Sequence, residues 1–100
     1  MLSVRSIETK EGRIVAICDL ELLGKKFKEG KAVLDLEKYS SFYQGLKIPN
    51  DSPLLDDLVK KAKSVNAVGL KSLRALERLG FDVSGTKKVK GVPHLQVYRI

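Results

Sequence analysis

The stretch RIVAICDL, residues 13–20, is apolar at nearly every position and decides the fold of this chain. Such a run is typical of a strand that is covered on both faces of a sheet. The preceding stretch LSVRSIETK, residues 2–10, alternates apolar and polar side chains and meets a turn at Glu11 and Gly12. The two stretches therefore predict a β-hairpin.

Further strands are expected on the C-terminal side of this hairpin. Apolar and polar side chains alternate over residues 31–37, which predicts a third short strand. Residues 40–48 mix aromatic side chains with a glycine and fit either a strand or a turn. The closing stretch HLQVYRI, residues 94–100, predicts a last strand.

A first helix is expected in the middle of the chain, over about residues 53–64. Asp51 or Ser52 can accept a hydrogen bond from its free backbone N–H groups, and Pro53 suits its first position. Its leucines, with Val59, recur at the spacing of one buried helix face.

A second helix is expected over about residues 67–79. Asn66 is placed to cap its start, and Gly80 is placed to end it in the left-handed conformation. Its leucines cover about half of the circumference, and the opposite side is basic. The basic residues on that side are Lys71, Arg74 and Arg78.

The order of these elements defines the fold class as α+β. We expect a small, largely antiparallel sheet with two consecutive amphipathic helices and a C-terminal strand. A chain of 100 residues is long enough for one hydrophobic core, so residues 1–100 are expected to form one globular domain.

The composition, with 43% hydrophobic and 31% charged residues, is that of a soluble globular protein. No apolar run approaches the roughly 20 residues that cross a bilayer, and charged residues interrupt the first strand, so we expect a cytoplasmic protein without a membrane partner. Cys18 is the single cysteine, which excludes an internal disulfide and a zinc knuckle.

The formal net charge of +7 is concentrated in the second half of the chain. Residues 1–50 carry nine basic and seven acidic side chains, whereas residues 51–100 carry ten and five. An excess of positive charge favours a polyanionic partner through the release of counterions, without indicating sequence readout.

Two glycine-flanked segments carry most of the candidate binding residues. In GKKFKEGK, residues 24–31, the spacing of the glycines and the alanine after the last lysine do not match a nucleotide-binding P-loop. The segment is expected to form a basic loop between two strands, and direct contact of its lysines with RNA phosphates is the alternative. In GTKKVKGVPH, residues 85–94, the lysines are expected to bind phosphates. If this loop folds back beside the second helix, its lysines and the basic side of that helix form one cationic surface. Besides Lys31, the two segments contain the candidate lysines Lys25, Lys26, Lys28, Lys87, Lys88 and Lys90.

Two further residues are candidates for ligand contact. His94 follows a proline-fixed turn and is expected either to bond to backbone or to touch a ligand. Phe42 and Tyr43 are adjacent, so one is expected to enter the core while the other remains available to stack on a base. Packing is the favoured role for such a residue, and Tyr43 is the candidate for contact with a base.

Several fragments together resemble a known archaeal family, domain of unknown function 424. They are CDLELLGKKFKEGKAVLDL (18–36), FYQGL (42–46), NAVGLKSLRALERLG (66–80) and GVPHLQVYRI (91–100), and the likeness extends from about residue 2 to residue 100. The resemblance implies a small archaeal cytoplasmic protein of α+β fold with no established activity. It also implies RNA binding and a place in translation, because predictions for the family lean that way.

Three functions are consistent with the sequence. The first is a non-enzymatic RNA-binding or ribosome-associated protein that contacts phosphates through the candidate residues above. The second is an adaptor that docks a protein partner through Phe42, Tyr43 and the loop ELLGK, residues 21–25. The third is a small enzyme that uses Cys18 or His94. No catalytic set, metal site or cofactor is expected, and the sequence leaves the oligomeric state open.

Overall fold

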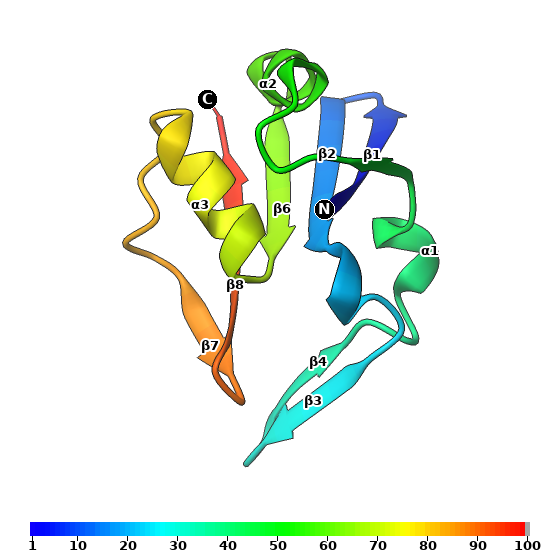
Figure 1. The fold of residues 1–100 in the computed structure, drawn as a ribbon, viewed down its shortest axis with the longest axis vertical. Helices are drawn as coiled ribbons and strands as arrows, with labels where there is room; N and C mark the ends of the chain where they lie inside the picture. The colour runs from blue at the N-terminus through cyan, green and yellow to red at the C-terminus, as the bar shows by residue number, and fades with distance from the viewer. Residues whose placement is uncertain (100) are drawn as a thin grey trace.

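Helices α2 and α3 lie on one face of a six-stranded sheet (Figure 1). The structure is a computed structural model that describes residues 1–99. The strands of the main sheet, in spatial order, are β5 (Leu46–Ile48), β1 (Leu2–Thr9), β2 (Gly12–Asp19), β6 (Ser64–Val68), β8 (Val92–Tyr98) and β7 (Lys87–Val89). The helices are the 3-10 turn η1 (Leu20–Leu22), α1 (Ser40–Tyr43), α2 (Pro53–Lys60) and α3 (Leu70–Arg78). The described helices are all too short to span a membrane.

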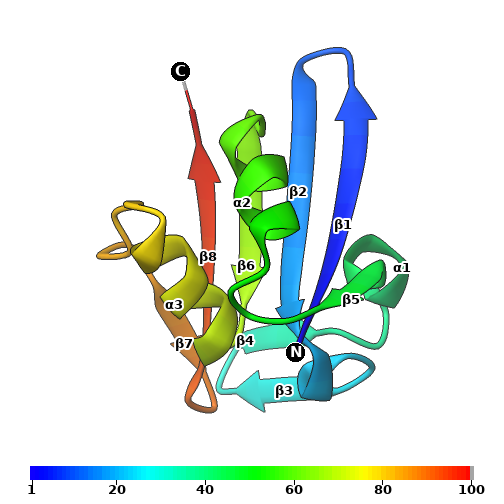
Figure 2. The same ribbon diagram turned by 45° about the horizontal axis from the view of Figure 1, so that its top comes forward.

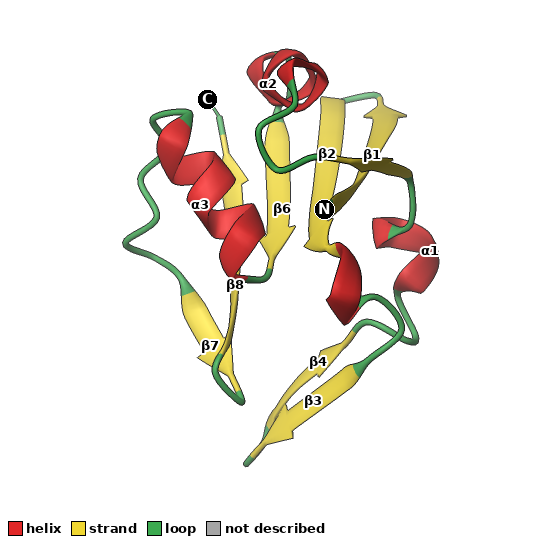
Figure 3. Ribbon diagram, in the orientation of Figure 1, coloured by secondary structure: helices red, strands yellow, loops and turns green. Residues whose placement is uncertain are grey.

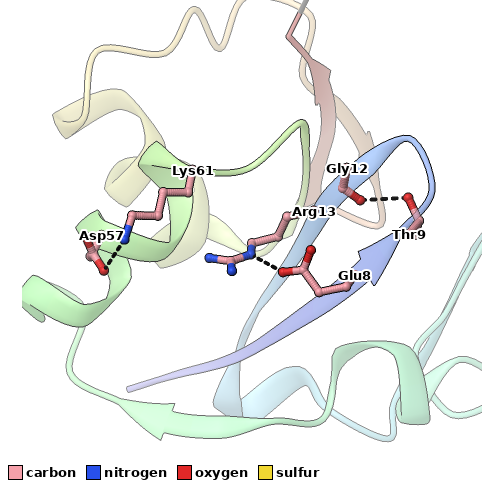
Figure 4. Close-up of polar contacts among 6 residues, drawn as sticks. All are labelled: Glu8, Thr9, Gly12, Arg13, Asp57 and Lys61. Atoms are coloured by element: carbon pink, nitrogen blue, oxygen red, sulfur yellow. Dashed lines mark hydrogen bonds and ion pairs between the residues drawn. The ribbon is translucent and has the colours of Figure 1, made fainter.

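The predicted hairpin of β1 and β2 is confirmed. The two strands pair from Leu2 opposite Asp19 to Thr9 opposite Gly12. At the turn, Gly12 has φ 124°, a conformation that glycine adopts without strain, and the Thr9 hydroxyl donates to the Gly12 carbonyl at 2.7 Å (Figure 4).

The prediction that the second helix begins near residue 67 is wrong, because residues Ser64–Val68 form strand β6. The second helix begins at Leu70, and Asn66 lies within β6 instead of capping the helix. Strand β6 pairs parallel with β2 on one side and antiparallel with β8 on the other. The two amphipathic helices are therefore separated by a buried central strand, and the α+β class with a largely antiparallel sheet is confirmed.

Both helices begin at identifiable caps. Ser52 accepts a hydrogen bond from the Leu54 amide at 3.2 Å, with Pro53 at the first helical position, as the sequence predicts. Helix α3 has Gly69 at its N-cap position and ends where Gly80, at φ 90°, turns the chain, which confirms the predicted end.

The main core lies between the sheet and helices α2 and α3. It contains Ile17 and Val65 from the sheet and Leu55, Leu73 and Leu76 from the helices. Each of these buried side chains contributes about 1.5–3 kcal/mol relative to an exposed one.

A second, smaller cluster lies at the lower end of the opposite face of the sheet. Strands β3 (Lys26–Glu29) and β4 (Ala32–Asp35) form a separate antiparallel hairpin, which extends below the main sheet in Figure 3. Side chains of this hairpin pack with Cys18, Leu36 and Val68.

Three other predictions need adjustment. The expected basic loop at 24–31 contains strand β3, which pairs with the predicted strand near 31–37. Residues 40–48, expected as a strand or turn, form helix α1 followed by strand β5. The last strand begins earlier than residue 94, at Val92, and Ile100 lies outside the described residues.

Candidate nucleic-acid interface

The two lysine-rich segments of the sequence come together at one end of the molecule. Strand β7 lies against β3 and β4 as well as against its partner β8. The turn after β7 contacts the tip of the other hairpin, because the backbone N–H of Lys90 donates to the Glu29 carboxylate at 3.3 Å. The hairpins β3–β4 and β7–β8 lie near one another in Figures 1 and 2. We call these two hairpins the basic hairpins.

Most lysines of the basic hairpins lack a compensating carboxylate. Lys26 approaches Asp35 at 4.0 Å. Among residues 1–99, the other lysines predicted in these segments have no carboxylate oxygen within that distance of their amino groups. These are Lys25, Lys28, Lys87, Lys88 and Lys90, and all five are exposed. The hairpins therefore present unpaired positive charge to solvent.

Some charges at the opposite end of the molecule are paired, whereas others, such as Lys63, have no carboxylate within 4.0 Å among the described residues. Figure 4 shows Arg13 bonded to Glu8 at 2.5 Å and Lys61 facing Asp57 at 3.5 Å. An ion pair in water offers a phosphate less net charge than an unpaired lysine does. What distinguishes the basic hairpins is that unpaired lysines from two segments far apart in the sequence meet there.

The three predicted basic residues of helix α3 line one hollow, but two of them form ion pairs with carboxylates. Lys71, Arg74 and Arg78 line a hollow of about 230 Å³ together with Asn50 and Asp51. The Lys71 ammonium lies 2.9 Å from the Glu21 carboxylate, and Arg78 donates to Asp56 at 2.8 and 3.4 Å. Arg74 has no carboxylate within 4.0 Å among the described residues.

These ion pairs also shift the acidity of their members. The hydrogen bond from Lys71 lowers the pKa of the Glu21 carboxyl, and the same bond raises the pKa of Lys71. Likewise, the hydrogen bond from Arg78 lowers the pKa of Asp56. The carboxylates on this side of α3 therefore stay charged, and they compete with any phosphate for the cations.

The expected packing of the 85–91 loop beside the second helix is not found. Helix α3 packs on β2, β6 and β8, whereas β7 packs on β8 and on the β3–β4 hairpin. The predicted basic residues thus belong to two groups held by different elements. One group is the basic hairpins, and the other is the helix face with its internal ion pairs.

His94 lies within the β7–β8 hairpin. It is half-buried on β8, opposite Lys87 of β7 in the strand register. The two side chains border a hollow of about 280 Å³ with Gly85, Leu95 and Gln96. A phosphate or base that contacts Lys87 would therefore lie within reach of His94.

Tyr43 is a packing residue in this structure. Its ring packs against the smaller hydrophobic cluster and meets Phe42 edge to face, with ring centroids 5.1 Å apart. Burial raises the pKa of the Tyr43 hydroxyl to about 12. A different aromatic residue, Tyr98, is 69% exposed, and sequence reasoning missed it because it lies at the end of an irregularly alternating strand.

The geometry does not support Cys18 as a nucleophile. Its side chain is 0% exposed, and burial, with the neighbouring Asp19 charge second, raises the pKa of the thiol to about 12. Its paired position on β6 is Val68, which in turn pairs with His94, so Cys18 and His94 stand two strands or roughly 10 Å apart. A thiol of this kind is inert packing. Residues 1–99 contain no group of three or more His, Cys, Asp or Glu side chains that could hold a metal ion.

Fold and charge distribution define a small α+β protein with two adjoining basic hairpins. The family model for proteins of unknown function DUF424 matches residues 7–100, and the chain belongs to this family. The fold is also similar to the crystal structure of an uncharacterized conserved protein from Methanopyrus kandleri, with a TM-score of 0.81 and 23% identity over 97% of this chain and 90% of that chain. No curated protein matches the chain.

Proposed function

We propose that this protein binds RNA without catalysing a reaction and that it acts in translation in the cytoplasm, on the ribosome or another RNA-containing particle. The observation that supports the proposal most strongly is the contact between the two basic hairpins. It brings together unpaired lysines from distant segments of the chain, since the contacting residues Lys90 and Glu29 are 61 residues apart in the sequence. Lysine ammonium groups treat phosphates as point charges, so the expected binding depends little on base sequence.

The test is a titration of RNA binding against salt concentration. Replacing Lys87, Lys88 and Lys90 by glutamine removes three unpaired charges from one hairpin. Each phosphate contact contributes about 0.7 to the slope of log K against log salt for a single strand, so the slope should fall by about 2. Affinity should fall with it.

A matched control removes three lysines at the other end of the molecule. Lys10, Lys60 and Lys63 lie at the β1–β2 turn, at the end of α2 and just before β6, and all three are exposed. Their replacement by glutamine lowers the net charge by the same amount. Equal effects of the two triple variants, or no effect of the hairpin variant, would contradict the proposal.

A protein-docking function is the second candidate because of an apolar hollow beside helix α1. This hollow, of about 400 Å³, is lined by Val33, Leu34, Leu36, Tyr39, Phe42, Tyr43 and Asp35. The loop ELLGK contributes less than expected, since Leu22 and Leu23 pack inward against the smaller hydrophobic cluster. Pull-down of partners from extract before and after nuclease treatment separates the two candidates, since a directly docked protein survives the nuclease.

A further inference from the structure

One face of the main sheet carries neither α2 nor α3, and along β8 it is exposed at Gln96 and Tyr98. Val65, Ala67 and Leu95 belong to the core beneath α2 and α3. Because successive side chains of a strand point to opposite faces, the residues between them point away from the helices. The β3–β4 hairpin covers the lower end of that other face, around Cys18 and Val68. Helix α1 lies against its β1–β2 part, where Ala16 is buried.

The strand register shows which residues make up this open face. One row crosses four strands from Arg5 through Ala16 and Asn66 to Gln96, and the next row crosses from Ile7 through Ile14 and Ser64 to Tyr98. We call these two rows the open face. Its most exposed aromatic side chain is Tyr98, whose hydroxyl accepts a hydrogen bond of 2.7 Å from the Gln96 side-chain amide.

The open face combines the positive Arg5, neutral polar side chains and the apolar Ala16, Ile7 and Ile14, and it has no acidic side chain. Neither row of the open face contains an aspartate or a glutamate. Arg5 supplies a positive charge at the β1 end, where its guanidinium donates to the Ser41 carbonyl. Asn66 and Gln96 supply both donors and acceptors in the middle of the face.

The open face continues into the basic hairpins. Along β8, the side chains of Tyr98, Gln96 and His94 point to the same face, and Lys87 lies opposite His94 on β7. Four residue steps along a strand span about 14 Å, so this line runs from an exposed aromatic ring to the first hairpin lysine over that length.

We propose that the open face binds the bases of single-stranded RNA, with Tyr98 as a stacking platform and the basic hairpins holding the adjoining phosphates. This inference rests on the proposed function and names the class of RNA that the same surface recognises. Exposed aromatic rings stack on unpaired bases, and amide side chains bond to base edges that a duplex hides. A polyanionic strand also complements a face that has cations at its borders and no carboxylates.

The first experiment compares single-stranded and double-stranded RNA. A labelled RNA of about 10 nucleotides, within the range of small single-strand-binding folds, is titrated alone and as a blunt duplex with its complement. The wild type should bind the single strand more tightly. Tyr98→Ala should weaken that binding about tenfold, whereas Tyr98→Phe, which keeps the ring, should retain most of it.

The matched control is Tyr39→Ala. Tyr39 is 54% exposed, belongs to neither row of the open face and lines the apolar hollow at α1. Its loss should leave the affinity for single-stranded RNA unchanged. An equal loss of affinity in the two alanine variants would overturn the proposed role of Tyr98.

A fluorescence measurement tests the stack directly. The chain contains no tryptophan, so Tyr98→Trp introduces a single indole on the open face. Saturating single-stranded RNA should quench its emission, and the emission of Tyr39→Trp should change little. Absence of quenching in Tyr98→Trp, in a variant that binds RNA, overturns the inference even if Tyr98→Ala fails to fold.

The outcomes separate this inference from the proposed function. If the hairpin lysine variant loses affinity while the Tyr98 variants bind as the wild type does, the inference is wrong and the proposed function stands. If the wild type binds neither RNA, both are wrong. If Tyr98→Ala instead converts a dimer to a monomer, a second copy covers the open face, and the inference is wrong.

Discussion

Asp19, the last residue of strand β2, caps the N-terminus of helix α3 through its hydrogen bonds with Ser72. The Asp19 carboxylate accepts hydrogen bonds from both the backbone N–H and the hydroxyl of Ser72, each at 2.8 Å, and one from the Lys71 amide at 3.1 Å. Helix α3 has no cap side chain of its own, because Gly69 occupies the N-cap position. The end of β2, at Asp19, therefore fixes where the helix begins, at Leu70, 51 residues further along the chain.

Removal of this carboxylate is expected to destabilise the protein. Asp19→Ala leaves the Lys71 and Ser72 amides of the first turn without a partner, one of them buried, and should lower the free energy of unfolding by about 2 kcal/mol. Asp19→Asn keeps one oxygen acceptor and should cost less. Urea denaturation measures both, with Ser52→Ala at the cap of α2 as a reference of about 1 kcal/mol. An Asp19→Ala variant as stable as the wild type would show that the capping contact contributes nothing.

Gly69 is expected to be sensitive to substitution. It has φ 105°, and an added Cβ would meet the Asp19 carboxylate at less than contact distance. Gly69→Ala should cost about 3 kcal/mol or more, since it combines backbone strain with loss of the cap. Gly80→Ala is the control, because Gly80 also has a positive φ but open space around its Cβ position, and should cost about 1–2 kcal/mol.

A double variant tests the mechanism of that cost. If Gly69→Ala acts by displacing the carboxylate, its cost in an Asp19→Ala background should be smaller than in the wild type. Additive costs in denaturation would instead assign the whole effect to backbone conformation.

Sequence patterns predicted the helices and strands that are specified by neighbouring residues. They missed strand β6, which is specified by pairing with strands far away in the sequence. The β1–β2 hairpin follows from alternation next to a glycine turn, and Ser52 and Pro53 mark the start of α2. Strand β6 has only five residues, and Asn66 and Gly69 within and after it resemble helix signals. What makes it a strand is pairing with β2 and β8, which local spacing does not encode.

The candidate site was predicted in the same uneven way. Clustered lysines are visible in the sequence, but the contact between the two lysine-rich segments is a tertiary feature. The neutralisation of Lys71 and Arg78 depends on Glu21 and Asp56, which lie in other elements. Which rows of the sheet remain uncovered is likewise set by tertiary packing. The exposure of Tyr98 therefore could not be predicted from the residues around it in the sequence.

The buried thiol is expected to make the protein less stable at alkaline pH. In the unfolded chain Cys18 loses its proton near its ordinary pKa of 9.0, whereas in the folded protein that pKa is raised to about 12, chiefly by burial. Between these values the unfolded state releases the proton and the folded state keeps it, so the free energy of unfolding falls as the pH rises through this window. Tyr43, with its pKa raised to about 12, adds to the fall in the upper part.

Cys18→Ala isolates the contribution of the thiol. Urea midpoints measured below and within this pH window should fall less steeply in the variant than in the wild type. The packing loss of the variant shifts all its midpoints together and does not alter this comparison. Identical pH dependence would mean that the thiol is not protected by burial.

The last prediction concerns the two groups of basic residues. Because Glu21 and Asp56 already pair with Lys71 and Arg78, a phosphate that binds these cations must displace a carboxylate, and little counterion is released. Replacing Lys71 and Arg78 by glutamine should therefore leave the salt dependence of RNA binding nearly unchanged. Replacing Lys87 and Lys88, which removes the same formal charge, should lower the slope by about 1.4. If the helix pair proves the more important of the two, RNA binds across α3, and the basic hairpins are solvated loops.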